Sequence, residues 1–237
     1  MLIRHMSRVH ILVVFLVATA GCALSQDNWL GGTGNWSNGA LWSTGVPLPG
    51  NDVLIYSGGS DYVTLDVNAS IKSLMLGGAY NGFTSELTDS GSPRDLTIAG
   101  ALNLDQTGDL NLSGGSTVSV GANSTIAGII FVSSSSTLSF AGNVDNPGSI
   151  VIPSYGAVAA VNISGTLTNE INSGFIISSV GGTSNIGALV NNGDFFVDSG
   201  AAVHLTNQPA GVTDVAMGQN SISSAHLPHR PRMRLPI

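Results

Sequence analysis

The sequence predicts an all-β protein, a parallel β-helix (β-solenoid) with a Trp-rich N-terminal cap. From about Leu96 to Asn207, short strands of Val, Ile, Leu and Ala end repeatedly at Gly, Asn or Ser. Charged residues make up only 9% of the chain, against about 25% in typical domains. Strands this short, each ended by Gly, Asn or Ser, are typical of a solenoid. The corners between its strands often require positive φ, which Gly adopts without steric cost. After residue 25, no window shows the apolar spacing of an amphipathic helix.

Residues 1–25 have the pattern of a signal peptide. Arg4 and Arg8 form a basic start, Ile11 to Ala20 is largely apolar, and Ala23-Leu24-Ser25 supplies the small residues of a cleavage site. The mature chain is therefore expected to begin at the next residue. The apolar run is shorter than the roughly 20 residues that a membrane span needs, so no transmembrane span is expected in the mature chain.

Lipidation is the alternative fate of this N-terminus. Thr19-Ala20-Gly21-Cys22 resembles a bacterial lipobox, although Thr stands where Leu is usual, and Cys22 is the only cysteine of the chain. We favour simple cleavage, which leaves a mature protein without cysteine and therefore without disulfides. Packing and strand pairing must then supply its stability.

Residues 26–52 form the predicted cap and contain all three tryptophans, Trp29, Trp36 and Trp42. Solenoids need a terminal unit that covers the open end of their apolar core, and indole rings are large enough for this role. The alternative is an aromatic platform on which the three rings stack against sugars. We favour the cap, and both roles hold if one indole stays exposed.

Residues 53–207 are predicted to form the repeats of the solenoid. After strands at Asp52 to Tyr56 and Tyr62 to Val67, the stretch from Gly77 to Arg94 is expected to be a longer loop, because it is rich in Gly, Ser and Thr. Later units share glycines that lie 26 and 19 residues apart, Gly148, Gly174 and Gly193. A repeat of about 20 to 25 residues is typical of one β-helix turn.

The chain resembles a known group of exported proteins. The segment Trp29 to Asp52, with Trp-Leu-Gly-Gly-Thr-Gly-Asn-Trp and Gly-Val-Pro before an Asp-Val strand, is similar to the start of bacterial secreted proteins with autotransporter-associated β-strand repeats. The Asn-Gly units resemble their coils. This resemblance covers roughly Asp27 to Asn207. It implies a right-handed parallel β-helix that is displayed or released at the cell surface.

Residues 208–237 break the composition of the repeats. From Ser224 onward they contain three of the seven basic residues together with several prolines. One hypothesis is a truncated or frame-shifted reading of a longer protein. The other is an irregular or disordered tail whose Pro and Arg protect a terminal sheet edge from pairing with other chains.

The charge distribution limits the classes of partner. All fourteen acidic residues lie between Asp27 and Asp214, and the only basic residues in that span are Lys72 and Arg94. Nucleic acid and anionic membrane surfaces need clustered basic side chains, so both are poor partners, and we expect no binding to nucleic acid. Surface polysaccharide or other extracellular matrix remains, as does self-association through an exposed sheet edge.

Four aspartates are the best candidates for catalysis. Glycoside hydrolysis needs two carboxyl groups about 5 to 9.5 Å apart, and the closest pairs along the repeats are Asp105 with Asp109 and Asp194 with Asp198. All four lie beside turn residues, where Asp commonly bonds its own backbone. A uronate lyase would also need basic residues, which are scarce. We therefore expect no catalytic residue.

Metal and cofactor sites are also not expected. The turn Gly58-Gly59-Ser60-Asp61 resembles a calcium-binding repeat, but it occurs once and lacks the second spaced Gly. His204 lies in a strand pattern and has no zinc-ligand spacing around it. The prediction is thus an exported, non-enzymatic structural or adhesin-like solenoid. The alternatives are a polysaccharide-degrading β-helix enzyme and a carbohydrate-binding module.

Overall fold

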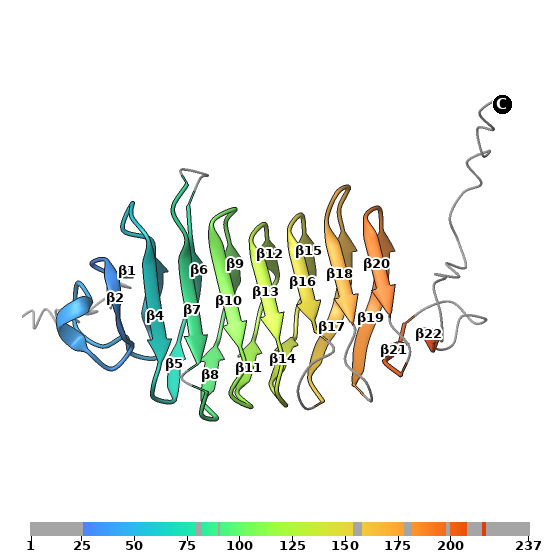
Figure 1. Ribbon diagram of the computed structural model, residues 1–237, viewed down its shortest axis with the longest axis horizontal. Helices are drawn as coiled ribbons and strands as arrows, with labels where there is room; N and C mark the ends of the chain where they lie inside the picture. Colours follow the sequence, from blue (N-terminus) through green and yellow to red (C-terminus); the bar gives the residue numbers. More distant parts are fainter. Residues whose placement is uncertain are drawn as a thin grey trace, which may run out of the picture.

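The protein is a parallel β-solenoid of about eight turns, which confirms the predicted fold class (Figure 1). The computed structural model describes residues 26–78, 82–89, 91–153, 158–177, 182–197 and 200–207, and the backbone of 215–216. The predicted signal peptide with Cys22 lies outside the described residues. So does the predicted tail, apart from strand β22 (Val215–Ala216), which pairs antiparallel with β21 (Ala202–Leu205).

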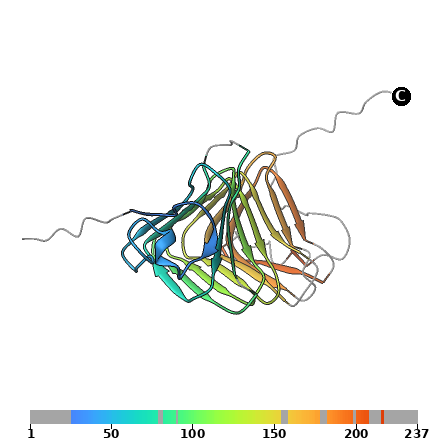
Figure 2. The same ribbon diagram turned by 60° about the vertical axis from the view of Figure 1, so that its left-hand side comes forward.

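The strands lie on three faces, here called I, II and III, and each turn contributes one strand to each face except the first, which has no strand on face III. Face II is a separate sheet of eight strands. Its strands in spatial order are β2 (Gly32–Asn35), β4 (Asp61–Leu65), β7 (Ser85–Asp89), β10 (Gly108–Leu112), β13 (Ile129–Val132), β16 (Ser149–Ile152), β18 (Gly174–Ile177) and β20 (Asp194–Val197). Figure 2 shows the coils from nearer the end of the tube.

Faces I and III belong to one sheet of fourteen strands that bends at a corner of the solenoid. Face I contains β1 (Gln26–Asn28), β3 (Asp52–Ile55), β6 (Ser73–Leu76), β9 (Leu102–Leu104), β12 (Ser124–Ile126) and β15 (Val144–Asn146). Face III contains β5 (Ala69–Ile71), β8 (Asp95–Ile98), β11 (Thr117–Val120), β14 (Thr137–Phe140) and β21. The long strands β17 (Ala160–Asn169) and β19 (Thr183–Asn191) continue around the corner and belong to both faces.

The register of face II gives the length of each turn. Asp61 pairs with Ser85, an offset of 24 residues, and Ile129 pairs with Ser149, an offset of 20. These offsets agree with the predicted repeat of 20 to 25 residues. The first turn is longer, because Gly32 pairs with Asp61, and the extra residues include the short 3-10 helix η1 (Gly39–Leu41).

The core is a set of side-chain columns that run along the solenoid axis. Strands alternate buried and exposed residues, so a parallel register places one apolar side chain above another. On face II one buried column consists of Val63, Leu87, Leu110, Ile130, Ile150, Phe175 and Phe195. The rings of its last two members stack with centroids 5.2 Å apart. Because each turn buries its neighbours, stability comes from contacts between adjacent coils.

The expected loop between Gly77 and Arg94 is wrong, because it contains strand β7. Ser85 and Asp89 point inward and are buried, at 1% and 4% exposure. The Ser85 hydroxyl donates to Asp61, and the Asp89 carboxylate accepts hydrogen bonds from Ser113. Asp89 therefore occupies an inward position that Leu65 takes in the preceding turn, while Ser85 continues a position held there by the polar Asp61. Two polar inward residues hide the strand from an analysis of hydrophobic alternation.

Several corner glycines are needed for close approach of two coils rather than for positive φ. Gly128 has no positive φ, but a Cβ built on it would lie 1.9 Å from the Gly108 carbonyl oxygen. A Cβ on Gly148 would likewise lie 2.2 Å from the Gly128 carbonyl oxygen. The prediction of Gly at the corners is correct, while its stated reason holds only for others, such as Gly77 and Gly115.

A buried asparagine ladder stabilises the last turns at the corner between faces I and II. Asn146 donates from Nδ2 to Asn169 Oδ1 at 2.7 Å, and Asn169 donates from Nδ2 to Asn191 Oδ1 at 2.8 Å. Asn169 Nδ2 also reaches the Asp194 carbonyl oxygen at 2.9 Å. These bonds satisfy the Nδ2 groups of Asn146 and Asn169 and the Oδ1 of Asn169, which would otherwise be costly to bury. The Oδ1 of Asn146 is buried and has no hydrogen-bond partner among the described residues. The ladder bonds also explain the Asn-Gly signature of these units.

Candidate functional site

The tryptophan cluster is buried in the first turn. Trp29, Trp36 and Trp42 are 2%, 0% and 3% exposed. Trp42 packs edge-on against both others, with ring centroids 5.0 Å from Trp29 and 4.9 Å from Trp36. Its Nε1 donates to the Trp36 carbonyl oxygen at 2.8 Å. No indole presents a face to solvent, so the predicted carbohydrate contact has no accessible ring on which a sugar can stack.

The cap is also continuous with the solenoid. Strands β1 and β2, within residues 26–52, pair in parallel with β3 and β4 of the next turn. An isolated bridge between Trp29 and Trp42 closes the segment over the core. The indoles therefore lie where the first turn covers the end of the apolar interior, as expected of a capping unit.

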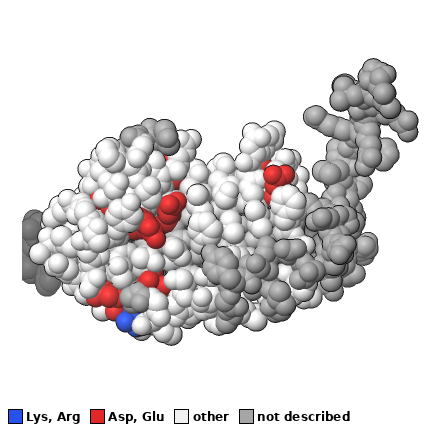
Figure 3. Space-filling view, in the orientation of Figure 1, with Lys and Arg blue, Asp and Glu red and all other residues white. Residues whose placement is uncertain are grey.

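Asp109 lies beside Glu86, and the sequence-based pairing with Asp105 is not the arrangement that the fold produces. Asp109 on β10 is the register partner of Glu86 on β7, and both side chains lie on the outer surface of face II. Directly paired residues on neighbouring strands are about 4.8 Å apart along the hydrogen-bonding direction. Acidic side chains accordingly gather over this part of the face (Figure 3). Asp105 instead lies in the short connection before β10, where its side chain accepts a hydrogen bond from the backbone amide of Gln106.

Asp109 has a perturbed acidity. Partial burial, with a smaller contribution from the negative charge of Glu86, raises the pKa of Asp109 to about 6. A carboxyl group with a raised pKa beside a second carboxyl group is a feature of glycosidase sites, where the first serves as the acid. Tyr62, the register partner of Glu86 on the other side, is 44% exposed and supplies an aromatic ring beside the pair.

Of the second predicted pair, Asp194 and Asp198, only the first lies within the described residues. Asp194 is exposed at the start of β20 and its register partner on β18 is Gly174. Asp198 lies outside the described residues. Glu86 was missed by sequence reasoning because it lies in the stretch expected to be a loop. The alternation of Ser85 to Asp89 was the only local signal for it.

The turn that resembles a calcium-binding repeat uses its carboxylate internally. Asp61 is fully buried and accepts from the Ser57 amide at 2.8 Å, the Ser57 hydroxyl at 2.7 Å and the Ser85 hydroxyl at 3.3 Å. Its oxygens therefore stabilise the β3–β4 turn. Among the described residues, no cluster of three or more His, Cys, Asp or Glu has the arrangement of a metal site.

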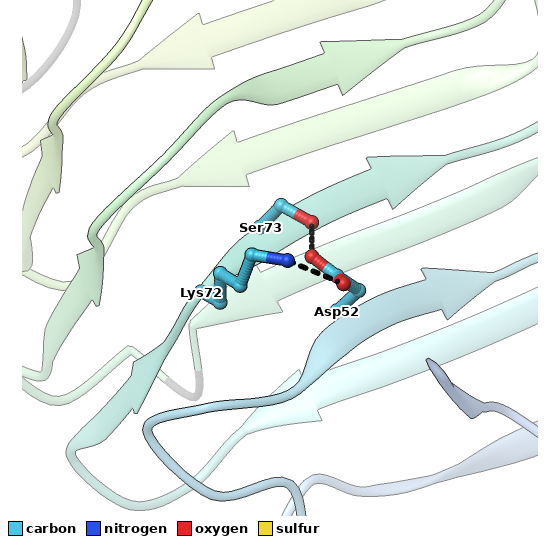
Figure 4. A network of polar contacts seen from close by, with 3 residues as sticks. All are labelled: Asp52, Lys72 and Ser73. Carbon is cyan, nitrogen blue, oxygen red and sulfur yellow. Dashed lines mark hydrogen bonds and ion pairs between the residues drawn. The ribbon is translucent and has the colours of Figure 1, made fainter. Parts of the chain in front are cut away.

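The two basic residues of the solenoid make local contacts. Lys72 donates from Nζ to Asp52 Oδ2 at 2.9 Å, and the Ser73 hydroxyl donates to Asp52 Oδ1 at 2.6 Å (Figure 4). The hydrogen bonds from Ser73 and Lys72 hold the pKa of Asp52 below its usual value. Arg94 donates to the Pro93 carbonyl oxygen. Neither residue lies beside the Glu86–Asp109 pair in the register of face II.

A shallow groove of about 380 Å³ crosses face III over strands β8, β11, β14 and β17. One column of its lining carries hydroxyl and amide groups, and the next column carries small side chains. The first column consists of the register partners Thr97, Ser119, Ser139 and Asn162. The second consists of Ala99, Gly121, Ala141 and Ser164. His204 lies further along the same face on β21, as predicted for a strand residue.

The outer surface of face II changes character along the axis. Toward the C-terminal turns, Phe131, Val151, Ile176 and Phe196 are successive register partners and form an apolar column. Phe131 and Phe196 are 36% and 52% exposed. The acidic pair and this apolar column thus occupy different halves of one flat surface.

No family model, curated protein or solved structure matches the chain. In the part of the chain that the structure describes, no helix has the length and apolar character needed to cross a membrane. The class that the fold itself defines is a parallel β-solenoid with a tryptophan-capped first turn.

Proposed function

We propose that this chain is an exported, non-enzymatic β-solenoid that acts as a structural or adhesin-like module at the cell surface or in the extracellular space. The observation that carries the proposal is the in-register stack of parallel strands along three faces. Such a stack forms a regular scaffold with long, flat outer surfaces. The signal-peptide pattern of residues 1–25 supports export, and the resemblance to proteins with autotransporter-associated β-strand repeats supports surface display.

Export is tested with the full chain in a bacterial host. The expected result is a processed product that starts at Gln26 by intact mass and is degraded when protease is added to whole cells. A Cys22→Ser variant should behave identically, because cleavage after Ser25 removes that residue. An unprocessed protein that stays protected inside the cells would contradict the proposal. A product that starts at a lipid-modified Cys22 would show that the protein is anchored to a membrane rather than released.

A polysaccharide hydrolase is the second candidate, and the Glu86–Asp109 pair favours it. The pair lies on an open face, its two carboxyl groups come from adjacent strands, and Asp109 has a raised pKa. In this role Asp109 would protonate the leaving oxygen while Glu86 acts as base or nucleophile. Partial burial of Asp109, with the smaller contribution of the Glu86 charge, provides the competing, purely structural explanation of the raised pKa.

Mass spectrometry decides between the two candidates. The mature chain is incubated with bacterial and plant polysaccharides, and new oligosaccharides are sought. The scaffold proposal expects none. If products form, Glu86→Gln and Asp109→Asn should each abolish them, whereas Asp194→Asn on the same face should not. That pattern of activities would contradict the non-enzymatic scaffold and support the polysaccharide hydrolase.

A further inference from the structure

We propose that the groove on face III binds an extended, uncharged polysaccharide chain that lies across strands β8, β11, β14 and β17. This inference rests on the proposed adhesin-like function and names the ligand class for it. The groove is lined by residues of four consecutive turns, so it suits a ligand that repeats along the solenoid axis rather than a single small molecule.

The polar column of the groove has free hydrogen-bonding capacity. Within the described part of the chain, the hydroxyls of Thr97, Ser119 and Ser139 take part in no hydrogen bond. The three residues are direct register partners on neighbouring strands. Their spacing is therefore the strand spacing of about 4.8 Å. Asn162 continues the column, and its Oδ1 accepts from the Asn185 side chain at 2.9 Å. Its Nδ2 makes no hydrogen bond to another described residue.

The second column supplies the floor for a sugar ring. Ala99, Gly121 and Ala141 lie two residues after the hydroxyl-bearing positions of the same turns. Because these residues have a methyl side chain or none, the surface is recessed along this column. It offers apolar contact to the C–H groups of a pyranose. Sugar hydroxyls can then pair with the neighbouring column. Saccharide sites commonly combine such an apolar surface with a few fixed polar groups.

The lack of charge in the groove restricts which repetitive polymers can bind to it. None of the residues that line the groove is ionisable, so the site offers no counter-charge to nucleic acid, to uronate polymers or to acidic peptides. A neutral glycan meets this condition, and an extended β-linked hexose chain repeats at nearly the strand spacing. A peptide strand would instead pair with a sheet edge, because the backbone groups inside face III are already paired.

Native affinity electrophoresis tests this inference with the mature chain. Gels contain hydroxyethyl cellulose, laminarin or galactomannan as neutral probes and alginate as the charged probe. We expect at least one neutral polymer to retard the protein and alginate not to retard it. The double variant Ser119→Ala/Ser139→Ala should bind about tenfold more weakly, because it loses two hydrogen bonds to the ligand. Ser119→Tyr, which fills the groove, should abolish retardation.

Thr117→Ala is the matched control. Thr117 lies on the same strand as Ser119 and is exposed, but it is not part of the groove; its retardation should equal that of the wild type. Far-UV circular dichroism verifies that every variant folds. Equal retardation of the double variant, or no retardation by any neutral polymer, would overturn the inference. If the chain is nevertheless exported and displayed, the proposed function stands without this ligand; if the chain stays inside the cell, the proposed function fails independently of the groove.

Discussion

Asn169→Ala should strongly destabilise the C-terminal turns. The Asn169 side chain is fully buried and has four hydrogen-bonding partners, one of which, the Ser173 hydroxyl, shares its single proton with the Glu170 carbonyl oxygen. It donates to the Asn191 side chain and to the Asp194 carbonyl oxygen. It accepts from Asn146 at 2.7 Å and from the Ser173 hydroxyl at 2.9 Å. Alanine removes these bonds. Asn146 Nδ2 and the Ser173 hydroxyl keep the Gly174 and Glu170 carbonyl oxygens as acceptors, whereas Asn191 Oδ1 and the Asp194 carbonyl oxygen lose the Asn169 donor.

The expected cost follows from these bonds. Each net hydrogen bond contributes about 1 kcal/mol, and an orphaned buried partner costs more. Three full bonds and one shared bond give about 3 to 4 kcal/mol. The bonds to Asn191 and Asp194 are only partly buried, so water replaces some of their energy. We therefore expect a loss of about 3 kcal/mol in the free energy of unfolding of these turns.

Two spectroscopic probes localise the effect. All three tryptophans lie in the first turn, so their fluorescence reports on the N-terminal end during urea denaturation. Far-UV circular dichroism reports on all strands. Because solenoid stability is a sum of local coil terms, Asn169→Ala should lower the circular dichroism midpoint more than the fluorescence midpoint.

Asn111→Ala provides the comparison variant. Asn111 lies on β10 at an outward position, and its side chain makes no hydrogen bond to another described residue, so its replacement should change the free energy of unfolding by less than about 0.5 kcal/mol. A cost below about 1 kcal/mol for Asn169→Ala, or a cost equal to that of Asn111→Ala, would refute the assignment of stability to the ladder.

Three further predictions concern other parts of the fold. Because burial and Glu86 raise the folded-state pKa of Asp109 from 3.8 to about 6, stability should fall as pH rises from about 4 to about 6. Asp109→Asn should remove this fall and, after discounting for solvent screening, add about 1 kcal/mol at pH 7. Trp36→Ala should cost about 4 kcal/mol by opening the capped end of the core, measured by thermal unfolding. Gly128→Ala should lower the melting temperature by several degrees, because its Cβ would collide with the Gly108 carbonyl oxygen.

Each of these has its own control. For Asp109→Asn, the Asp194→Asn variant on the same face should leave the pH profile intact; an identical change in both would remove the role of Asp109. For Gly128→Ala, Gly50→Ala is the match, since a Cβ on Gly50 meets nothing within 4 Å. Equal melting temperatures would show that the coils can separate at this corner. A folded, fully stable Trp36→Ala protein would contradict the capping role.

The sequence alone determined the architecture. Short apolar strands recurring at about 20 to 25 residues allow little other than stacked coils, since each strand is too short to form a core by itself. The predicted strands at Asp52 to Tyr56 and Tyr62 to Val67 correspond to β3 and β4, with ends that differ by one or two residues. The cap followed from the same logic, because three tryptophans before the first repeat have no other apolar surface to cover.

Tertiary structure decided which residues meet. Asp105 and Asp109 are four positions apart in the chain, but Asp109 faces Glu86, because parallel register joins residues one full turn apart. That register depends on the length of every corner, and the local sequence does not specify it. The strand around Glu86 was invisible for the same reason, since its inward Ser85 and Asp89 are acceptable only where neighbouring turns supply their hydrogen bonds. The groove on face III likewise exists only because four turns align their hydroxyl and small residues in columns.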